Sequence, residues 1–393
     1  MSHAPSGAAR TGLIRVIAGD AALPAGSMAL CTNYTAVTAD LRRGVDALID
    51  SGADIRSLLS PEHGYWGAVQ AGQSEGEGRD EATGLPILDT YLSAGEALDS
   101  LVYRAGADQI LIDLQDIGTR FYTYMWTLYD LLCSAARTGL GVVVLDRPNP
   151  LGGQVAGPGL DPAASSFIGR VSIPLRHGLT LGELARWFNT VHVPEATGAQ
   201  CALEVIEVSN WSRELQSPDL PWVMPSPNMP TWRTAVLYPG TGLLEGTTLS
   251  EGRGTTAPFE LFGAAWTDSR FAAALRERSL PGVEVREAVF RPLFSKWAGE
   301  TTHGAQLHLT DASAFDPIVT GWSVLDTVAD LYPDQQLWRT PGEGRPPFID
   351  LLWGSAALRE GINSRSDLST VLAESPPTPI VPEGVALYPE GRP

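Results

Sequence analysis

The chain has 393 residues, of which 44% are hydrophobic and 18% are charged, so it is too apolar to be disordered and long enough for two domains. It carries 45 Asp and Glu residues against 27 Lys and Arg residues, a formal net charge of -18. Nucleic acids and anionic membrane surfaces are bound through basic patches, so we expect neither as a partner.

The N-terminal residues and the cysteines bear on the compartment. The first residues, MSHAPSGAARTG, lack the charged-then-apolar order of a signal peptide, and no apolar run is long enough to span a membrane. Cys31, Cys133 and Cys201 stand in apolar surroundings without CxxC spacing, which predicts buried free thiols. We therefore expect a cytoplasmic protein, or a secreted one if the sequence has been trimmed.

Short apolar runs alternate with amphipathic stretches in the first half of the chain. The apolar runs predict strands at residues 27–32, 55–59, 109–114 and 141–145. The amphipathic stretches predict helices at residues 41–50, 95–104, 127–137 and 181–191. This alternation is typical of the α/β class, with a parallel sheet covered on both faces.

The second half has a different composition. Trp, Pro and Ser become frequent around residues 208–230, and we place the domain boundary there, with domains at residues 1–215 and 216–393. The later pattern is that of a smaller α+β domain, with a strand at residues 306–309 and helices at residues 322–331 and 352–360. The proline-rich residues after Glu374 predict an extended surface tail.

Polar clusters follow three of the predicted strands. The sequences SPEHG, QDIGTR and DRPNP stand where these strands end. Because the carboxyl ends of parallel strands meet at one edge of a sheet, we expect all three clusters to converge on one crevice.

The first cluster carries Glu62, followed by His63, two aromatic residues and a glycine-rich loop. Cleavage of a glycosidic bond needs a proton donor for the leaving oxygen, usually a carboxylic acid. Nearby aromatic rings desolvate such an acid and also stack on a sugar. The alternative is a loop glutamate that only caps a turn.

The other two clusters leave two interpretations open. Gln115, Asp116 and Arg120 stand past a strand end, where they could hold a sugar, or Asp116 and Arg120 could form a structural ion pair. Asp146 and Arg147 lie in a turn stiffened by prolines, where Asp146 is either a binding residue or a loop anchor.

The second half adds further candidates. PSPNMP places Asn228 on a stiff loop, able to present an amide to a ligand. Glu245, Glu251 and Arg253 stand among many glycines, which indicates backbone close to a ligand or, alternatively, a glycine-dense turn with solvated charges.

Generic nucleotide-binding, hydrolase-elbow and zinc-protease motifs are missing. His303 and His308 are five residues apart on a predicted strand, which puts them on opposite faces and makes them a poor metal pair. We expect no metal and no organic cofactor.

Several long motifs in this order resemble the exo-β-N-acetylmuramidase family typified by NamZ. They are SPEHG, DLQDIGTRFYTYMWTLYD, VVLDRPNPLGG, SIPLRHGLTLGELA, PSPNMPT and YPGTGLLEGTTLSEGRGTTAPFE. The resemblance implies a Rossmann-like N-terminal domain, a smaller C-terminal domain and a catalytic cleft between them. It implies release of N-acetylmuramic acid from the non-reducing end of peptidoglycan-derived fragments, with Glu62 as the catalytic residue. The sequences of relatives often have an aromatic motif near the C-terminus, and in this chain a proline-rich sequence stands in its place.

The resulting hypothesis makes Glu62 the general acid and His63 a neighbour that tunes or orients it. The second catalytic group is Asp116, Glu245 or Glu251, or the substrate's own acetamido group. The residues expected to bind substrate are Gln115, Arg120, Tyr122, Asp146, Arg147, Asn228 and Arg253. Two alternatives are a non-catalytic muropeptide-binding protein and a hexosaminidase for another N-acetylated sugar.

Overall fold

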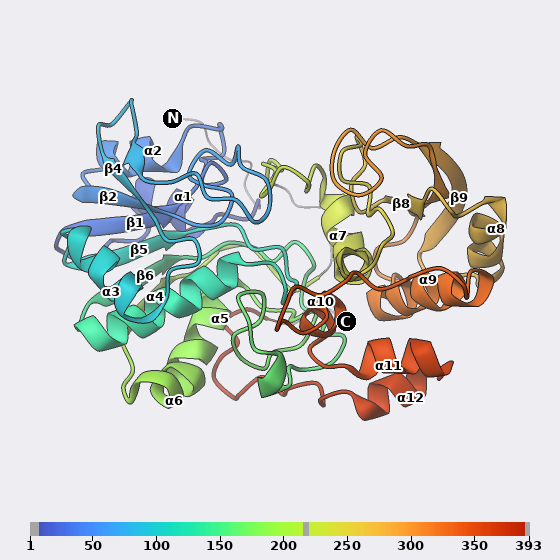
Figure 1. The fold of residues 1–393 in the computed structure, drawn as a ribbon. Coiled ribbons are helices and arrows are strands. Elements are labelled where there is room, and N and C mark those ends of the chain that lie inside the picture. Colours follow the sequence, from blue (N-terminus) through green and yellow to red (C-terminus); the bar gives the residue numbers. More distant parts are fainter. Residues whose placement is uncertain (1–7, 215–219, 390–393) are drawn as a thin grey trace.

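A seven-stranded sheet forms the first part of the molecule (Figure 1). The computed structural model describes residues 8–214 and 220–389. The strands of the large sheet are β1 (Met28–Thr32), β2 (Ile55–Ser60), β3 (Gly78–Arg79), β4 (Pro86–Asp89), β5 (Gln109–Asp113), β6 (Gly141–Leu145) and β7 (Ala202–Ile206). Their order is β3-β4-β2-β1-β5-β6-β7, and every pairing is parallel except that of β3 with β4. Without β3, this is the strand order of the Rossmann fold.

Helices cover both faces of this sheet. On one face lie α1 (Gly12–Ile17) and α2 (Gly44–Asp50), which pack on Leu30 and Leu111. On the other lie α3 (Gly95–Arg104), α4 (Tyr124–Thr138), α5 (Leu181–Trp187), the π-helical turn η2 (Phe188–His192) and α6 (Val193–Thr197). Successive residues of a strand point to opposite faces of the sheet. Ala29 and Cys31 of β1 therefore pack in the core beneath α3 and α4, whereas Leu30 packs beneath α1 and α2.

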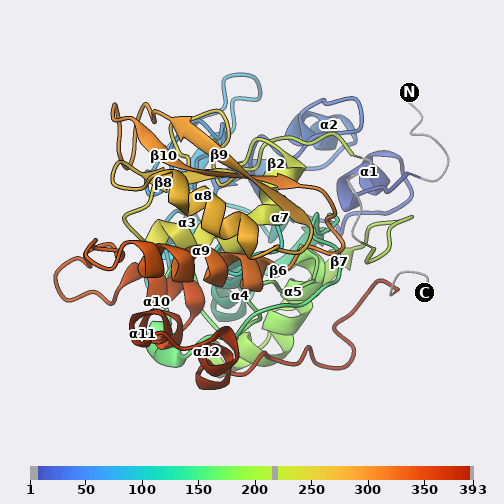
Figure 2. The same ribbon diagram turned by 90° about the vertical axis from the view of Figure 1, so that its right-hand side faces the viewer.

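The second part of the molecule is built on a smaller antiparallel sheet. Its strands are β8 (Leu261–Ala264), β9 (Val283–Phe290) and β10 (Thr302–Leu309), in the order β8-β10-β9. Its helices are α7 (Trp232–Thr241), α8 (Ser269–Glu277), α9 (Pro317–Leu331), α10 (Phe348–Trp353), α11 (Ala357–Ser364) and α12 (Leu368–Glu374). The short 3-10 helices are η1 (Pro162–Ala164) in the first part and η3 (Gly242–Gly246) in the second. Figure 2 shows α8 and α9 stacked beneath the small sheet.

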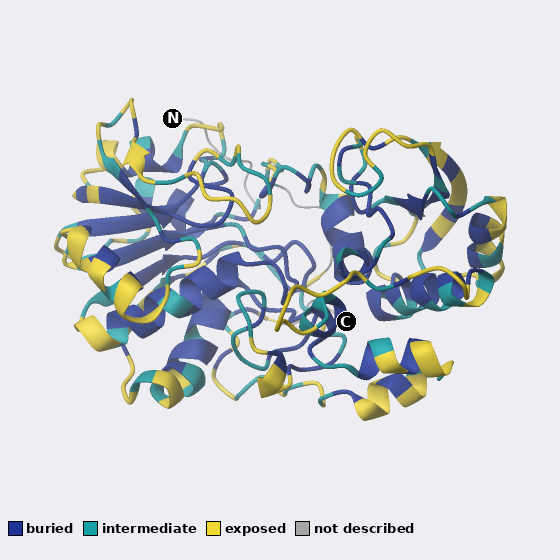
Figure 3. Ribbon diagram, viewed as in Figure 1, coloured by how far each residue is buried: buried dark blue, intermediate teal, exposed yellow. Residues whose placement is uncertain are grey.

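The two parts share one hydrophobic core. The cluster that holds Leu128 of α4 also holds Leu237 of α7 and Val328 of α9. Buried segments therefore run from the large sheet across the middle of the molecule (Figure 3). Burial on this scale makes the interface between the parts a packed one rather than a loose hinge.

The predicted fold class is confirmed: a Rossmann-like sheet domain is followed by a smaller α+β domain. The predicted boundary between residues 215 and 216 lies outside the described residues. His303 and His308 lie on β10, five positions apart and so on opposite faces, as expected. In the described part of the chain, no helix is long and apolar enough to cross a membrane.

Two predicted helices are wrong in part. The helix predicted at residues 181–191 is instead the α-helix α5 followed by the π-helical turn η2. The backbone hydrogen bonds change from the α to the π pattern just before Pro194, because proline has no N–H to donate. The helix predicted at residues 352–360 is broken. Its break is at Gly354, whose φ of 99° lies in the left-handed region that ends α10.

Residues 375–389, the described part of the tail, form no helix or strand, as predicted, but they are not wholly on the surface. Val385 and Tyr388 are only 2% and 7% exposed. The Tyr388 ring packs edge-on against Trp211 at 4.9 Å, and its hydroxyl accepts a hydrogen bond from the Val208 amide at 2.9 Å. The surface prediction fails there because one aromatic residue anchors a tail that is otherwise rich in proline.

Candidate active site

A cavity of about 750 Å3 lies between the two parts of the molecule, beyond the carboxyl end of β2. The large sheet and its connections contribute Glu62, His63, Tyr91, Tyr122 and Thr123 to its lining, and the second part contributes Tyr238, Glu245, Arg253 and Phe259. The structure therefore brings five of the predicted site residues to one place: Glu62, His63, Tyr122, Glu245 and Arg253.

A tight turn after β2 presents Glu62 to this cavity. His63 and Gly64 have φ angles of 72° and 78°, so the chain reverses at once and the Gly64 amide donates to the Pro61 carbonyl at 3.0 Å. A left-handed conformation is unusual for histidine, and a non-glycine residue at such a position is often found at a functional site.

Both carboxylate oxygens of Glu62 are held. Oε1 accepts a hydrogen bond from the Gly72 amide at 2.9 Å, and Oε2 accepts one from the Thr123 hydroxyl at 2.6 Å. Glu62 is only 7% exposed. The glycine-rich loop and Thr123, the residue just before α4, therefore fix the carboxyl group in one orientation, as a positioned proton donor requires.

The groups beside Glu62 are predominantly uncharged. His63 donates through Nδ1 to the Val69 carbonyl at 2.9 Å, and burial lowers the pKa of His63, which favours the neutral ring with Nε2 as an acceptor. Burial and the nearby Glu62 carboxylate raise the pKa of Tyr91 to about 12. Glu62 therefore faces a largely neutral wall on its own side of the cavity.

The opposite wall carries a network of charged side chains that are partly or fully buried. Arg253 contacts the Glu245 carboxylate at 3.0 Å and the Glu251 carboxylate at 3.2 Å, and Lys296 contacts Glu251 at 2.8 Å. Burial opposes the charge of Arg253, but the two glutamates outweigh it and raise the pKa of Arg253. Gly252 and Gly254 have φ angles of 81° and 80°, which lets the backbone turn tightly around this network.

Aromatic rings form much of the remaining surface. Tyr238 packs edge-on against Phe259 at 4.6 Å and against Phe121 at 5.2 Å, and Arg253 lies over the Phe259 ring at 5.0 Å. Such a surface offers ring faces and hydroxyl groups together, which is how proteins commonly bind the apolar face and the polar edge of a sugar.

A second cavity of about 900 Å3 adjoins the first. Glu245 and Arg253 line both, and Glu251, Lys296 and Trp297 line the second. Glu251 is 2% exposed, so it is not a solvated turn charge, and Glu245 is paired with Arg253 in the cavity lining. Because they share part of their lining, the two cavities form one continuous cleft.

Asp116 and Arg120 do not line the cleft, and they do not form the ion pair that the sequence left open. Asp116 accepts hydrogen bonds from the Gly118 amide at 2.6 Å and from His177 at 3.1 Å. Arg120 is 0% exposed and donates to the carbonyl oxygens of Pro158, Ile173, Leu352 and Trp353. Arg120 thus joins the first part of the molecule to the end of α10.

Asn228 also stands apart from the cleft lining. Its amide donates to Gln70 Oε1 at 2.9 Å, which ties the 225–230 loop to the glycine-rich loop. The neighbouring residues Ser226 and Met229 do line the cavity. Asn228 therefore holds a wall of the cleft in place in this structure.

Asp146 is fully buried and anchors several segments. Its Oδ1 accepts from the amides of Arg147 and Gly182, and its Oδ2 accepts from the hydroxyls of Thr180 and Tyr388. Burial raises the pKa of Asp146 to about 6. The Asp146 carboxyl group therefore binds a proton more tightly in the folded chain than in the unfolded chain.

We expect the stability difference between the wild type and Asp146→Asn to depend on pH. The contribution of Asp146 is largest below pH ~4 and falls as the pH rises through ~6, so the difference should shrink by about 3 kcal/mol over that window. Denaturant unfolding at a series of pH values measures it. Asp99→Asn is the control and should show the opposite slope, because the hydrogen bond from Arg137 lowers the pKa of Asp99. A pH-independent difference for Asp146→Asn would contradict the assignment.

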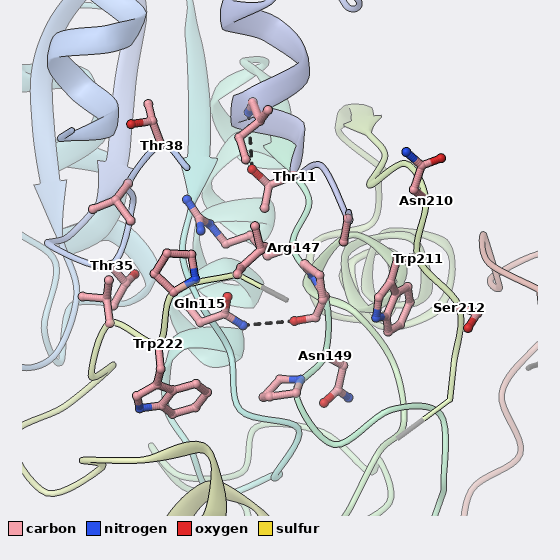
Figure 4. A pocket seen from close by; sticks show the side chains of 18 of the residues that line it. Thr11, Thr35, Thr38, Gln115, Arg147, Asn149, Asn210, Trp211, Ser212 and Trp222 are labelled. Carbon is pink, nitrogen blue, oxygen red and sulfur yellow. Dashed lines mark hydrogen bonds between the residues drawn. The ribbon is translucent and has the colours of Figure 1, made fainter. Parts of the chain in front are cut away.

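Gln115 and Arg147 line a different cavity, of about 130 Å3 (Figure 4). It lies beyond the carboxyl ends of β1, β5 and β6, whereas the larger cleft lies beyond β2. The three polar clusters thus follow strand ends at one edge of the sheet, but the prediction that they converge on one crevice is wrong, because they lie at two separate cavities.

Sequence reasoning missed several residues of the cleft. Thr123 lies in the same aromatic-rich stretch as Tyr122, and Tyr238 precedes a glycine-rich segment, so both stood in motifs already singled out. Tyr91 has no comparable signal, because its loop contains no glycine cluster or ionisable group. All three Cys residues are buried and free, as predicted. Within residues 8–214 and 220–389, no group of three or more His, Cys, Asp or Glu residues could hold a metal ion.

The fold and the cleft define a class: two-part α/β proteins with a buried carboxyl group in an aromatic cleft, an arrangement suited to the hydrolysis of glycosides. Family models agree with this class. The N-terminal model of exo-β-N-acetylmuramidase NamZ matches residues 28–233, and the C-terminal model of the same family matches residues 236–377. The chain belongs to the exo-β-N-acetylmuramidase NamZ family.

Individual relatives agree with this membership. The chain is 40% identical over 349 residues to the peptidoglycan β-N-acetylmuramidase NamZ of Bacillus subtilis (strain 168), covering 87% of this chain and 81% of that protein. Two crystal structures of DUF1343 family proteins from Bacteroides fragilis NCTC 9343 have similar folds. Their TM-scores are 0.81 and 0.74 at 30% and 28% identity, and each match covers 93% of this chain and 94% of the other.

Proposed function

We propose that this chain is an exo-acting glycoside hydrolase that releases N-acetylmuramic acid from the non-reducing end of peptidoglycan-derived fragments. One observation carries the proposal: the buried Glu62 carboxyl group, held by two hydrogen bonds, faces an aromatic cavity in a chain of the NamZ family. The Bacillus subtilis relative is a peptidoglycan β-N-acetylmuramidase. We also propose that residues 1–215 and 216–393 are the two domains that enclose the cleft.

In this proposal Glu62 protonates the leaving glycosidic oxygen. The Gly72 amide and the Thr123 hydroxyl hold the carboxyl group, and the His63 ring, which is neutral and donates only to the Val69 carbonyl, does not compete as an acid. Fixing the acid before substrate arrives removes the cost of orienting it during the reaction.

Glu245 is the best supported second catalytic group. Of the three carboxylates considered, only Glu245 lines the cavity that holds Glu62, whereas Glu251 lines only the adjoining cavity and Asp116 lies outside both linings. A carboxylate there would stabilise the positive charge that develops on the sugar or activate a water molecule. The substrate's acetamido group remains the alternative nucleophile, and in that case Glu245 acts through its charge.

A direct assay separates this proposal from its alternatives. The chain is incubated with a chromogenic β-glycoside of N-acetylmuramic acid and with the matching glycoside of N-acetylglucosamine. We expect turnover of the first well above the second. Turnover of the second alone would indicate a different hexosaminidase, and binding of muramic fragments without any turnover would indicate a non-catalytic muropeptide-binding protein.

We expect Arg253 to recognise the lactyl carboxylate that distinguishes N-acetylmuramic acid. It is the one of the three arginines considered that lines the cleft, and a guanidinium binds a carboxylate through two parallel hydrogen bonds. Arg253→Lys should lower kcat/KM for the muramic glycoside about tenfold more than for a lactyl-free analogue, roughly the effect of losing one bidentate contact. Arg147→Lys is the matched control and should leave the ratio unchanged. An unchanged ratio in Arg253→Lys would refute this role.

A further inference from the structure

Lys296 is the only lysine of the chain, and it lines the second cavity of the cleft. It lies between β9 and β10, on a segment in which its two neighbours, Ser295 and Trp297, have φ angles of 70° and 60°. Left-handed backbone is costly at residues other than glycine and is often found at functional sites. The segment is thus bent at an energetic cost, and the bend brings Lys296 to the cavity wall.

Three oxygen atoms surround the Lys296 ammonium group. Its Nζ donates hydrogen bonds to the carbonyl oxygens of Leu244 and Leu249 at 2.9 and 2.8 Å, and it lies 2.8 Å from Glu251 Oε2. An ammonium group has three donors on one nitrogen, whereas a guanidinium group spreads its donors over a planar fork. The three oxygens therefore suit lysine, although all other Lys and Arg positions in the chain are arginine. Because all three donors are directed at protein oxygens, Lys296 is not placed to bind substrate itself.

Lys296 stands at the end of a row of four charges of alternating sign. Glu251 lies between Lys296 and Arg253, and Arg253 lies between Glu251 and Glu245. Arg253 Nε is 3.2 Å from Glu251 Oε1, and Arg253 Nη2 donates to Glu245 Oε2 at 3.0 Å. Among the described residues, no hydrogen bond reaches Arg253 Nη1. Two carboxylates therefore hold the guanidinium and leave one of its ends for a carboxylate of the substrate.

The balance of this row depends on Lys296. The side chain of Glu251 is only 3% exposed, so water could not replace a lost cation there. Without the ammonium group, Arg253 would be the only cation of the described chain that contacts this carboxylate. Because a guanidinium binds a carboxylate best through two parallel hydrogen bonds, Arg253 would turn further toward Glu251 and away from the cleft.

We propose that Lys296 is a positioning residue for substrate recognition. By holding Glu251, it keeps the Arg253 guanidinium turned to the cleft, where Arg253 meets the lactyl carboxylate of the substrate. This inference rests on the proposed function and on the role expected for Arg253. None of the three oxygens around Lys296 belongs to Glu62, so the loss of Lys296 should change the preference between substrates rather than the proton transfer.

Lys296→Met tests the proposal, because methionine keeps much of the length of the side chain and loses the ammonium group. The quantity to measure is the ratio of kcat/KM for the muramic glycoside to kcat/KM for its lactyl-free analogue. We expect this ratio to fall about tenfold, the effect of losing one bidentate contact, as in Arg253→Lys. Arg291→Met is the matched control, because Arg291 is exposed and donates to the Thr301 hydroxyl at 3.1 Å rather than to Glu251. The same loss of charge there should leave the ratio unchanged.

A double-mutant cycle shows whether Lys296 acts through Arg253. In the Arg253→Lys background, Lys296→Met should change the ratio by less than about twofold, because the contact that it supports is already lost. A further tenfold fall would mean that Lys296 acts by another route and would overturn the proposal. An equal fall of kcat/KM for both substrates in Lys296→Met would also overturn it, since that pattern indicates a purely structural role.

Reductive dimethylation of the folded wild type needs no variant. It keeps the positive charge of Lys296 but leaves one N–H, and mass spectrometry can follow the single lysine directly. We expect the same fall in the ratio, and an unchanged ratio after complete modification would overturn the proposal even if Lys296→Met does not fold. A wild type inactive on both glycosides would overturn the proposed function and this inference with it. An active wild type with an unchanged ratio in folded Lys296→Met would overturn this inference alone.

Discussion

Glu62→Gln should lower kcat on a natural muramic disaccharide by about 10²–10⁴ while the chain stays folded, which is the usual contribution of a general acid. Glutamine keeps the shape of the side chain, its amide oxygen can still accept from the Gly72 amide and its NH2 group can donate to the Thr123 hydroxyl oxygen, but it has no acidic proton to give. The loss should appear in kcat, because substrate binding uses other groups of the cleft.

The leaving group provides a second test of the same role. A nitrophenyl glycoside needs little protonation as it leaves, so Glu62→Gln should slow its cleavage far less than that of the disaccharide. Loss of a nucleophile would slow both substrates alike. Glu77→Gln is the matched control, because Glu77 is an exposed glutamate near the same loop that only pairs with Arg104. Near-normal kcat in Glu62→Gln on the disaccharide would exclude Glu62 as the acid and leave Glu245 and Glu251.

The four central strands of the large sheet, β2, β1, β5 and β6, could be predicted because each of them carries its own signal, whereas β3 and β4 were not predicted. The strand at residues 141–145 and the helix at residues 95–104 were predicted with their observed bounds. A short apolar run rich in β-branched residues indicates a buried strand, and an amphipathic stretch indicates a helix, without information from the rest of the chain. The edge strand β7 was missed because its exposed residues alternate with half-buried ones, as at an outer strand, and the run is not continuously apolar.

The division of the site into two hollows could not be predicted. Glu62 and Arg147 both follow strands of one sheet, and the strand rule alone places them together. What separates them is the 225–230 segment, more than 70 residues later in the chain, whose Ser226 and Met229 line the cleft while Trp222 just before it lines the small cavity. Such long-range packing leaves no local pattern.

Arg120 shows the same limit in a single side chain. In the sequence it stands in a polar cluster past a strand, where an arginine suits a substrate carboxylate. In the structure it crosses to α10 and binds the last carbonyl oxygens of that helix, a known way of satisfying a helix C-terminus. Burial lowers the pKa of Arg120 to about 9, so it keeps its proton near neutral pH.

Arg120→Met should therefore lower the free energy of unfolding by about 3–5 kcal/mol, as for other buried polar contacts that lose one partner. Its guanidinium serves four carbonyl oxygens, those of Pro158, Ile173, Leu352 and Trp353, and no water can replace it at 0% exposure. Methionine fills the space without a donor, so those acceptors would stay buried and unpaired.

Denaturant unfolding of Arg120→Met beside Arg137→Met measures this effect. Arg137 pairs with Asp99 at the surface, so its replacement should cost only about 0.2–1 kcal/mol. A substrate-binding Arg120 would give the opposite pattern. The variant would then unfold like Arg137→Met but show a raised KM for the muramic substrate and an unchanged KM for its lactyl-free analogue. The structure leads us to expect the loss of stability, because every contact of the Arg120 guanidinium joins two segments of the protein and none opens to the cleft.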